Sequence, residues 1–298
     1  IKVSVYSVIG LVTVGENAHN SLMSNIEGVF MLGIALAYFL FPAFNSPDDP
    51  NAWLNVYWLL AGLAGISFLF LYRADFQEGE EIPGADLGED FLAMFQLLSR
   101  VLVIVFVFSA FLFVMIEQGI MTWLPTFNDR VLELPENLAI MMASILAVSL
   151  GIGRFMAGFL TQRFSWVKVL SVCLIGAKAM VILVLPRAVN AEIGEVQTLA
   201  DIPLIGYAFP LVGLFIAPIY PLLNSVVLSA LPKKLHSPMS GLIIIFSALG
   251  GTLGSRIIGI LFKEVGADTA FSYTLIPMLV LFAMLFILKR LTDQDKAA

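Results

Sequence analysis

The chain is poor in charged residues and in the residue types that form most catalytic and metal sites. Asp, Glu, Lys and Arg make up 13% of its 298 residues, and it has one cysteine and two histidines. The single cysteine, Cys173, excludes a disulfide within the chain. The sequence has no HExxH, no GxSxG and no phosphate-binding glycine loop. We therefore expect neither an enzyme active site nor a metal or other cofactor.

Apolar residues are abundant. They make up 59% of the chain, against roughly 45–50% in ordinary soluble domains. A soluble fold of this length buries only about three quarters of the surface that its unfolded chain exposes, so the excess is expected to face lipid. The net charge is −6 and the acids cluster outside the apolar runs, which argues against nucleic-acid binding.

About nine apolar runs are long enough to cross a bilayer, which predicts an all-α integral membrane protein. The longest polar connection, 73–99, is first acidic and then amphipathic. We predict that it is a cytoplasmic loop between the remainder of one helical bundle, 1–72, and a six-helix bundle, 100–298. The nine runs lie at 1–19, 27–45, 53–72, 100–125, 137–160, 167–187, 203–230, 238–262 and 268–289.

Basic residues near helix ends favour the cytoplasmic side of a membrane. Here they fall on alternate connections and on the C-terminal tail, while acids mark the opposite connections. We therefore expect the C-terminus to be cytoplasmic. The basic residues are Arg73, Arg163, Lys168, Lys233, Lys234, Lys289 and Arg290.

Charged residues inside spanning helices cost at least about 2.5–3.5 kcal/mol each and need a cavity or a partner. The segment 15–20 places Glu16, His19 and Asn20 on one helical face, beside Asn17, which suits a polar ligand. Alternatively, Glu16 marks the end of the helix, because the chain from there to Glu27 is polar.

Glu117 and Gln118 lie deep in another apolar run. A carboxyl group buried there could exchange a proton near neutral pH, as a proton-coupled carrier requires. The alternative is a protonated glutamic acid that is hydrogen-bonded to a neighbouring helix.

The stretch 151–163 reads GIGRFMAGFLTQR. Its glycines favour close helix approach. Arg154 and Arg163 could pair with acids whose contacts break when the cytoplasmic side opens, or could serve only as positive anchors. Lys178 and Arg256 are weaker candidates for ligand contacts, because their long stems can reach the membrane surface.

This stretch resembles a loop motif of the major facilitator superfamily, matched at Gly153, Arg154, Gly158, Gln162 and Arg163. The resemblance implies a helical transporter bundle in which the nine runs correspond to helices 4–12 of 12. On this register the chain is expected to hold only part of the first half of the carrier.

Within the superfamily the chain is similar to the fucose/glucose–proton symporters. The acid, Ala18 and Asn20 of segment 15–20 match that family's fourth-helix pattern, but His19 and Ser21 depart from it. The segments 113–117 and 218–221 resemble its seventh and tenth helices. The resemblance implies that Glu16 is a proton-linked carboxylate and that Asn20 contacts the sugar.

We therefore expect a secondary active transporter in a bacterial inner membrane that moves a small polar solute, favoured to be a sugar, with protons. Glu16 and Glu117 are the candidates for proton coupling. The alternatives are a facilitator or exporter for another metabolite and a membrane sensor or scaffold derived from a transporter. The candidate solute contacts are Asn17, His19, Asn20, Gln118, Trp123, Tyr220 and Asn224.

Overall fold

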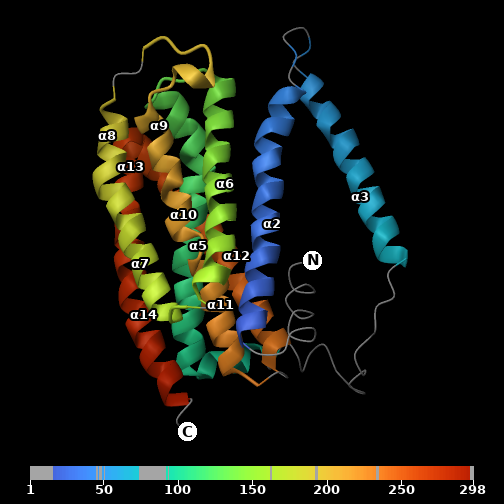
Figure 1. The fold of residues 1–298 in the computed structure, drawn as a ribbon, viewed down its shortest axis with the longest axis vertical. Coiled ribbons are helices and arrows are strands. Elements are labelled where there is room, and N and C mark those ends of the chain that lie inside the picture. The colour runs from blue at the N-terminus through green and yellow to red at the C-terminus, as the bar shows by residue number, and fades with distance from the viewer. Residues whose placement is uncertain are drawn as a thin grey trace.

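The computed structural model describes residues 16–44, 46, 49, 51–73, 92, 94–161, 163–191, 194–232 and 235–295; the side chains of residues 16–21, 24, 42, 237, 294 and 295 are outside this description. The described chain is a bundle of helices (Figure 1). The long helices are α2 (Glu16–Ala43), α3 (Val56–Arg73), α5 (Val101–Arg130), α6 (Glu136–Leu160), α7 (Trp166–Ala179), α11 (Ile219–Ala230), α12 (His236–Glu264) and α14 (Leu275–Asp295).

Seven helical segments in the described chain are long and apolar enough to cross a membrane. An eighth apolar stretch, Asn25–Phe41, lies within α2 and is shorter. These segments match the predicted runs from 27–45 onward, and the prediction of an all-α membrane bundle is confirmed. The seven are Ala52–Arg73, Val101–Arg130, Glu136–Leu160, Trp166–Val189, Leu204–Ala230, Pro238–Glu264 and Ala267–Asp293.

One predicted boundary is wrong. The sequence suggested a polar connection between the runs 1–19 and 27–45, but residues 16–43 form one uninterrupted helix, α2. Glycine and proline, the residues that most often end a helix, are absent between Glu16 and Glu27. The asparagines and serines there weaken helix propensity without breaking the helix. Residues 1–15 of the first predicted run lie outside the described chain.

Two of the spans are interrupted away from their first turns. Leu204–Ala230 is divided into α9 (Leu204–Ala208), η5 (Phe209–Leu211), α10 (Val212–Ile216) and α11, with breaks near Pro210 and Pro218. Proline lacks the amide hydrogen that a regular helix needs, which explains both breaks. In Trp166–Val189, the π-helical turn η3 (Met180–Val184) joins α7 to α8 (Leu185–Val189).

Short helical turns begin two further spans, Ala52–Arg73 and Ala267–Asp293, or lie in connections. They are η1 (Ala52–Asn55), η2 (Leu97–Ser99), η4 (Leu199–Asp201), α13 (Ala267–Ala270) and η7 (Phe271–Thr274).

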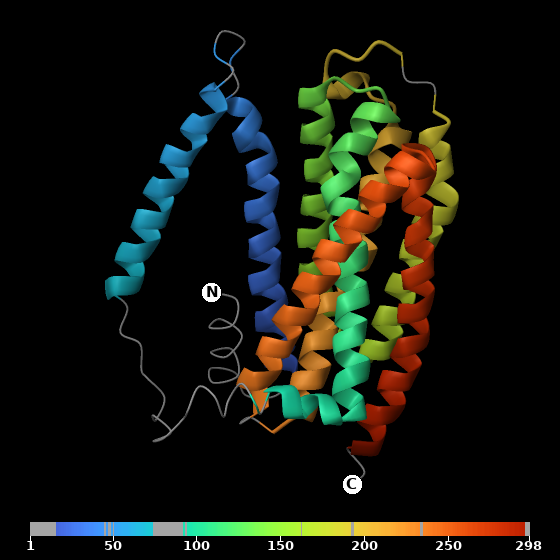
Figure 2. The same ribbon diagram turned by 180° about the vertical axis from the view of Figure 1, so that it is seen from behind.

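Helix α5 is central to the bundle and contacts α6, α11, α12 and α14. Helix α2 packs against α6 and α11. In contrast, α3 diverges from the rest of the bundle in both views and is almost wholly exposed (Figures 1 and 2). The site described below forms where α2, α5 and α6 meet.

Helices α5 and α12 lie side by side because two glycines of α12 leave room for the α5 backbone. A Cβ at Gly250 would collide with the carbonyl oxygen of Phe111, and one at Gly254 with that of Met115. Small residues of this kind allow helices in membranes to approach closely. The two glycines therefore set the distance between α5 and α12.

We expect Gly254→Ala to destabilise the protein by about 1–3 kcal/mol, because the added Cβ meets the Met115 carbonyl, which cannot move aside as a side chain can. The apparent melting temperature in detergent should fall accordingly. Gly62→Ala on α3 is the matched control, since a Cβ there meets nothing within 4 Å. Equal melting temperatures for the two variants would show that the close approach of α5 and α12 is not required.

Candidate functional site

Arg154 is the most deeply buried cation in the described chain, and the residue is 1% exposed. It lies on α6 six residues before Leu160, or about 9 Å along the helix axis from that end. A Cβ at the preceding Gly153 would lie 2.7 Å from the Cβ of Ala217 and from the carbonyl oxygen of Leu214. The glycine thus lets α6 pack against α10, which places Arg154 in the interior rather than at the membrane surface.

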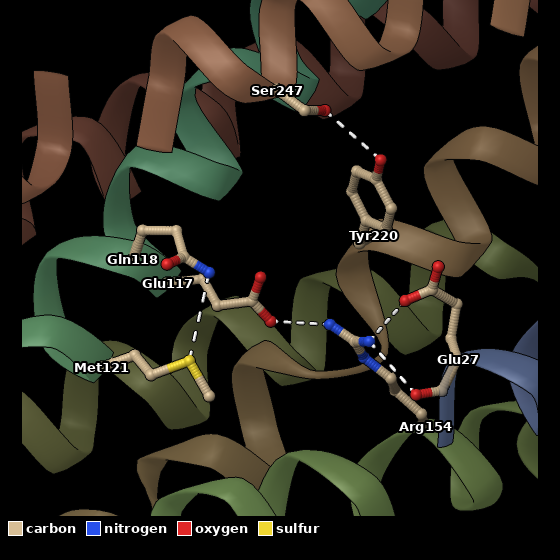
Figure 3. A network of polar contacts seen from close by, with 7 residues as sticks. All are labelled: Glu27, Glu117, Gln118, Met121, Arg154, Tyr220 and Ser247. Carbon is tan, nitrogen blue, oxygen red and sulfur yellow. Dashed lines mark hydrogen bonds and ion pairs between the residues drawn. The ribbon is translucent and has the colours of Figure 1, made fainter. Parts of the chain in front are cut away.

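Two carboxylates bind the Arg154 guanidinium (Figure 3). Its Nη1 lies 2.5 Å from Oε2 of Glu27 on α2, and its Nη2 lies 2.7 Å from Oε1 of Glu117 on α5. Nη1 also donates to the backbone carbonyl oxygen of Glu27, at 3.3 Å. We call Glu27, Glu117 and Arg154 the arginine triad; it joins three helices.

The arginine triad is closed to water. Glu27 is 2% exposed and Glu117 is 5% exposed. Charge-assisted hydrogen bonds of this length are about twice as strong as neutral ones. With both acids ionised the triad has one negative charge in excess, because two carboxylates share one guanidinium. Loss of either contact would leave a carboxylate in a low-dielectric interior, which is costly unless the carboxylate takes up a proton.

A polar pocket of about 520 Å³ lies between α5, α11 and α12. Gln118 and Tyr220 line it, and the Tyr220 hydroxyl lies 3.3 Å from the Ser247 hydroxyl. The Tyr220 ring stacks on Phe113, with ring centroids 5.7 Å apart. The described residues that line it are Val114, Gln118, Thr122, Tyr220, Ile244, Ser247, Ala248, Gly251, Thr252 and Ser255.

Helix α5 connects this pocket with the arginine triad. Glu117 and Gln118 are consecutive residues, and successive side chains of a helix project about 100° apart. Glu117 therefore reaches Arg154, as Figure 3 shows, while Gln118 lines the pocket. A displacement of α5 would act on both places at once.

Two of the predicted solute contacts do not line the pocket. The Trp123 indole donates from Nε1 to the Ser255 carbonyl oxygen at 2.7 Å and packs on Phe262 of α12, with centroids 5.2 Å apart. Asn224 is fully buried, and neither polar atom of its side-chain amide has a hydrogen-bond partner among the described residues.

The predicted loop motif separates into a buried part and a surface part. Arg154 and Gly158 are buried. Arg163 is exposed, and its guanidinium lies 5.2 Å from the Phe159 ring centroid, a cation–π contact rather than an acid pair. Gln162 lies outside the described residues.

The fourth-helix candidates are only partly located. Glu16, Asn17, His19 and Asn20 belong to the first turns of α2, but their side chains lie outside the described part of the chain. Their assignment as proton and solute contacts therefore stays a prediction.

Sequence reasoning missed Glu27, which it read as part of a polar connection. The signal was present as a helical spacing: Met23, Glu27 and Met31 are four residues apart, and all three are buried on one face of α2. An acid within such an apolar stripe indicates a buried partner.

The weaker cationic candidates lie elsewhere. Lys178 Nζ is 4.0 Å from the Phe282 ring centroid, between α7 and α14. Arg256 is exposed on α12. The described residues also contain no group of three or more His, Cys, Asp or Glu side chains that could hold a metal ion.

Comparison with known proteins identifies the family. The model of the Major Facilitator Superfamily matches residues 6–254. The chain belongs to the major facilitator superfamily. Members of this superfamily are transporters and in general not enzymes, and the superfamily predicted from the arginine-glycine motif is confirmed. No curated protein sequence matches the chain.

Solved structures of superfamily transporters share the fold. FucP in the outward conformation is 18% identical with a TM-score of 0.69, over 98% of this chain and 72% of that chain. Another structure of this E. coli fucose:proton symporter gives a TM-score of 0.68 at 18% identity, over 98% of this chain and 73% of that chain. A bacterial homologue of the human lysosomal transporter Spinster, in an inward-facing and occupied conformation, gives a TM-score of 0.53 at 16% identity. The match covers 94% of this chain and 66% of that chain.

For this superfamily transporter we expect Arg154→Met to lower stability by about 3–5 kcal/mol, because it leaves two carboxylates buried without their cation. Arg163→Met is the matched control and should change stability by less than about 1 kcal/mol, the value of an exposed cation–π contact. Thermal unfolding in detergent measures both. Equal effects of the two variants would contradict the burial of charge at Arg154.

Proposed function

We propose that this transporter carries a neutral, sugar-like solute by alternating access, in symport with protons. The observation that carries the proposal is that two consecutive residues of α5 serve two places: Glu117 binds the buried Arg154, and Gln118 lines the pocket. In secondary transporters, solute and coupling-ion sites commonly lie near the membrane midplane at the interface of the two repeats.

The pocket chemistry supports a neutral solute. No charged side chain is among the described residues that line it, whereas Gln118, Thr122, Tyr220, Ser247, Thr252 and Ser255 offer amide and hydroxyl groups. Groups of this kind can donate to and accept from the hydroxyls of a sugar. Val114, Ile244 and Ala248 add apolar surface against which the carbon face of a sugar can pack.

The arginine triad supports proton coupling. Because two carboxylates compete for one guanidinium, a proton on either acid removes the excess negative charge and weakens one of the two ion pairs. Glu117 is the candidate coupling acid within the described side chains, and Glu16 is retained as a second candidate from the resemblance to fucose/glucose–proton symporters.

The same proposal includes the membrane topology. We place 1–72 in the first helical bundle and 100–298 in the second, with 73–99 as the cytoplasmic connection. The C-terminus is then cytoplasmic, in the inner membrane of a bacterium. The alternation of basic and acidic connections supports this orientation.

Transport assays with the complete protein in proteoliposomes test the function. We expect an inward proton gradient to drive accumulation of a labelled neutral monosaccharide, with L-fucose and D-glucose as the first probes. Glu117→Gln should lose accumulation by at least tenfold and keep counterflow, because the carrier can still exchange solute without coupling to protons. Glu264→Gln, at the exposed end of α12, is the control and should behave as the parent.

Two results would contradict the proposal. Accumulation that persists in both Glu117→Gln and Glu16→Gln would exclude the assigned proton roles. Counterflow without any response of the parent to the proton gradient would identify a facilitator instead.

A further inference from the structure

An apolar groove opens on the outer surface of the bundle, where α6 ends and α7 begins. Its volume is about 530 Å³, and Lys168 is the one charged side chain among the described residues that line it. The groove shares no described residue with the arginine triad or with the polar pocket. Its described lining is Leu160, Phe164, Val167, Lys168, Val169, Ser171, Val172 and Cys173.

The groove faces outward, toward lipid. Phe164 is 53% exposed and Val172 is 65% exposed. Val172 lies within the membrane span Trp166–Val189. Exposed apolar side chains of a membrane span meet the acyl chains of lipids, because the hydrocarbon layer holds no water. The apolar wall of the groove is therefore suited to a hydrocarbon chain.

Lys168 lies at the end of the groove that is nearest the membrane surface. It is exposed and is the third residue of the span Trp166–Val189. Val172 is one helical turn further along α7 and on the same face, and Cys173 is about 7.5 Å from Lys168 along the helix axis. A cation at the surface thus leads to an apolar wall that descends into the membrane. A phospholipid has the same order, with a charged headgroup above its chains.

The charge of Lys168 is not balanced by an acid with a described side chain. The sequence has no Asp or Glu between positions 137 and 191, and α10 and α11, which contact α7, have no charged residue. The acid of α14 with a described side chain, Asp293, is bound to Lys289 at 2.8 Å. A second exposed cation, Arg163, lies five residues before Lys168. This end of the groove therefore has a positive charge that a negative headgroup would complement.

We propose that this groove binds an anionic glycerophospholipid of the surrounding membrane, with the headgroup phosphate at Lys168 and an acyl chain along Val172. Basic pockets between transmembrane helices bind anionic headgroups in this way. Arg163 adds to the attraction through its charge, without lining the groove. A zwitterionic lipid binds more weakly, because its headgroup also has a positive charge that both cations repel. This inference does not depend on the proposed solute or on proton coupling.

Native mass spectrometry of the complete protein in detergent measures the lipid affinity directly. The two probes are dioleoylphosphatidylglycerol, which is anionic, and dioleoylphosphatidylcholine, which is zwitterionic and has the same acyl chains. We expect the first phosphatidylglycerol to bind with a Kd about fivefold lower than that of the first phosphatidylcholine, the effect of one basic residue on an anionic headgroup.

Two lysine variants assign this preference to the groove. Lys168→Gln should bring the two Kd values to within about twofold of each other, because the cation at the groove is lost. Lys263→Gln is the matched control, since this lysine is also exposed but lies in the last turn of α12. It should leave the preference of the parent unchanged.

Two tryptophan variants test the apolar part of the groove without a change of charge. Val172→Trp fills the space against Val172 and should raise the Kd for phosphatidylglycerol about tenfold, the loss of roughly two buried methylene groups. Leu279→Trp adds the same ring on α14, where Leu279 is 57% exposed and does not line the groove. This control should bind phosphatidylglycerol as the parent does.

Equal Kd values of the parent for the two lipids would overturn the inference. So would a Lys168→Gln variant that elutes as a folded, monodisperse protein and keeps the preference of the parent, or equal losses in the two tryptophan variants. Glycerol 1-phosphate, the headgroup without its chains, should not displace the lipid. Displacement at the Kd of phosphatidylglycerol would identify a site for free anions and overturn the assignment to a lipid.

Discussion

A guanidinium buried within a membrane-spanning bundle constrains everything around it. Arg154 cannot reach the membrane surface from its position on α6, where Gly153 packs against α10. Its charge has to be balanced by acids from neighbouring helices, and these come from α2 and α5. The positions of three helices thus depend on one ion-pair network. A pair of this kind contributes little net stability compared with apolar packing, and breaking it is costly. Such an interaction is suited to specifying one arrangement of helices over another.

Close packing surrounds the network on both sides. Helix α5 is held against α12 by the close approach at Gly250 and Gly254. Helix α2 packs closely against α6, where a Cβ at Gly28 would lie 2.7 Å from the Phe155 ring. Apolar surfaces in lipid gain little from contact with each other beyond packing. The ion pair of Glu27 with Arg154 therefore adds a specific contact between α2 and α6.

The fold was largely predictable from the sequence, because the length of an apolar run and the requirement for hydrogen-bonded backbone in lipid leave few alternatives. The buried Glu117 and Arg154 were also identified, since charges within apolar runs are conspicuous. Their pairing was not, because two residues 37 positions apart meet only through tertiary packing. Glu27 was missed for a different reason: its asparagine- and serine-rich neighbours resemble a connection, and its own burial comes from the packing of α2 against α6. Trp123 and Asn224 were predicted to contact the solute, but neither lines the pocket. Polar or aromatic character within a span does not reveal which face of the helix meets the pocket.

The account depends most on the position of the Arg154 side chain between two acids. A structure of the complete protein in lipid nanodiscs near neutral pH, at a resolution that defines side chains, measures this directly. The account predicts the guanidinium within about 3 Å of carboxylate oxygens of both Glu27 and Glu117, as charge-assisted hydrogen bonds require. An Arg154 side chain that extends to the lipid headgroups, with Glu27 on a different face of α2, would contradict it.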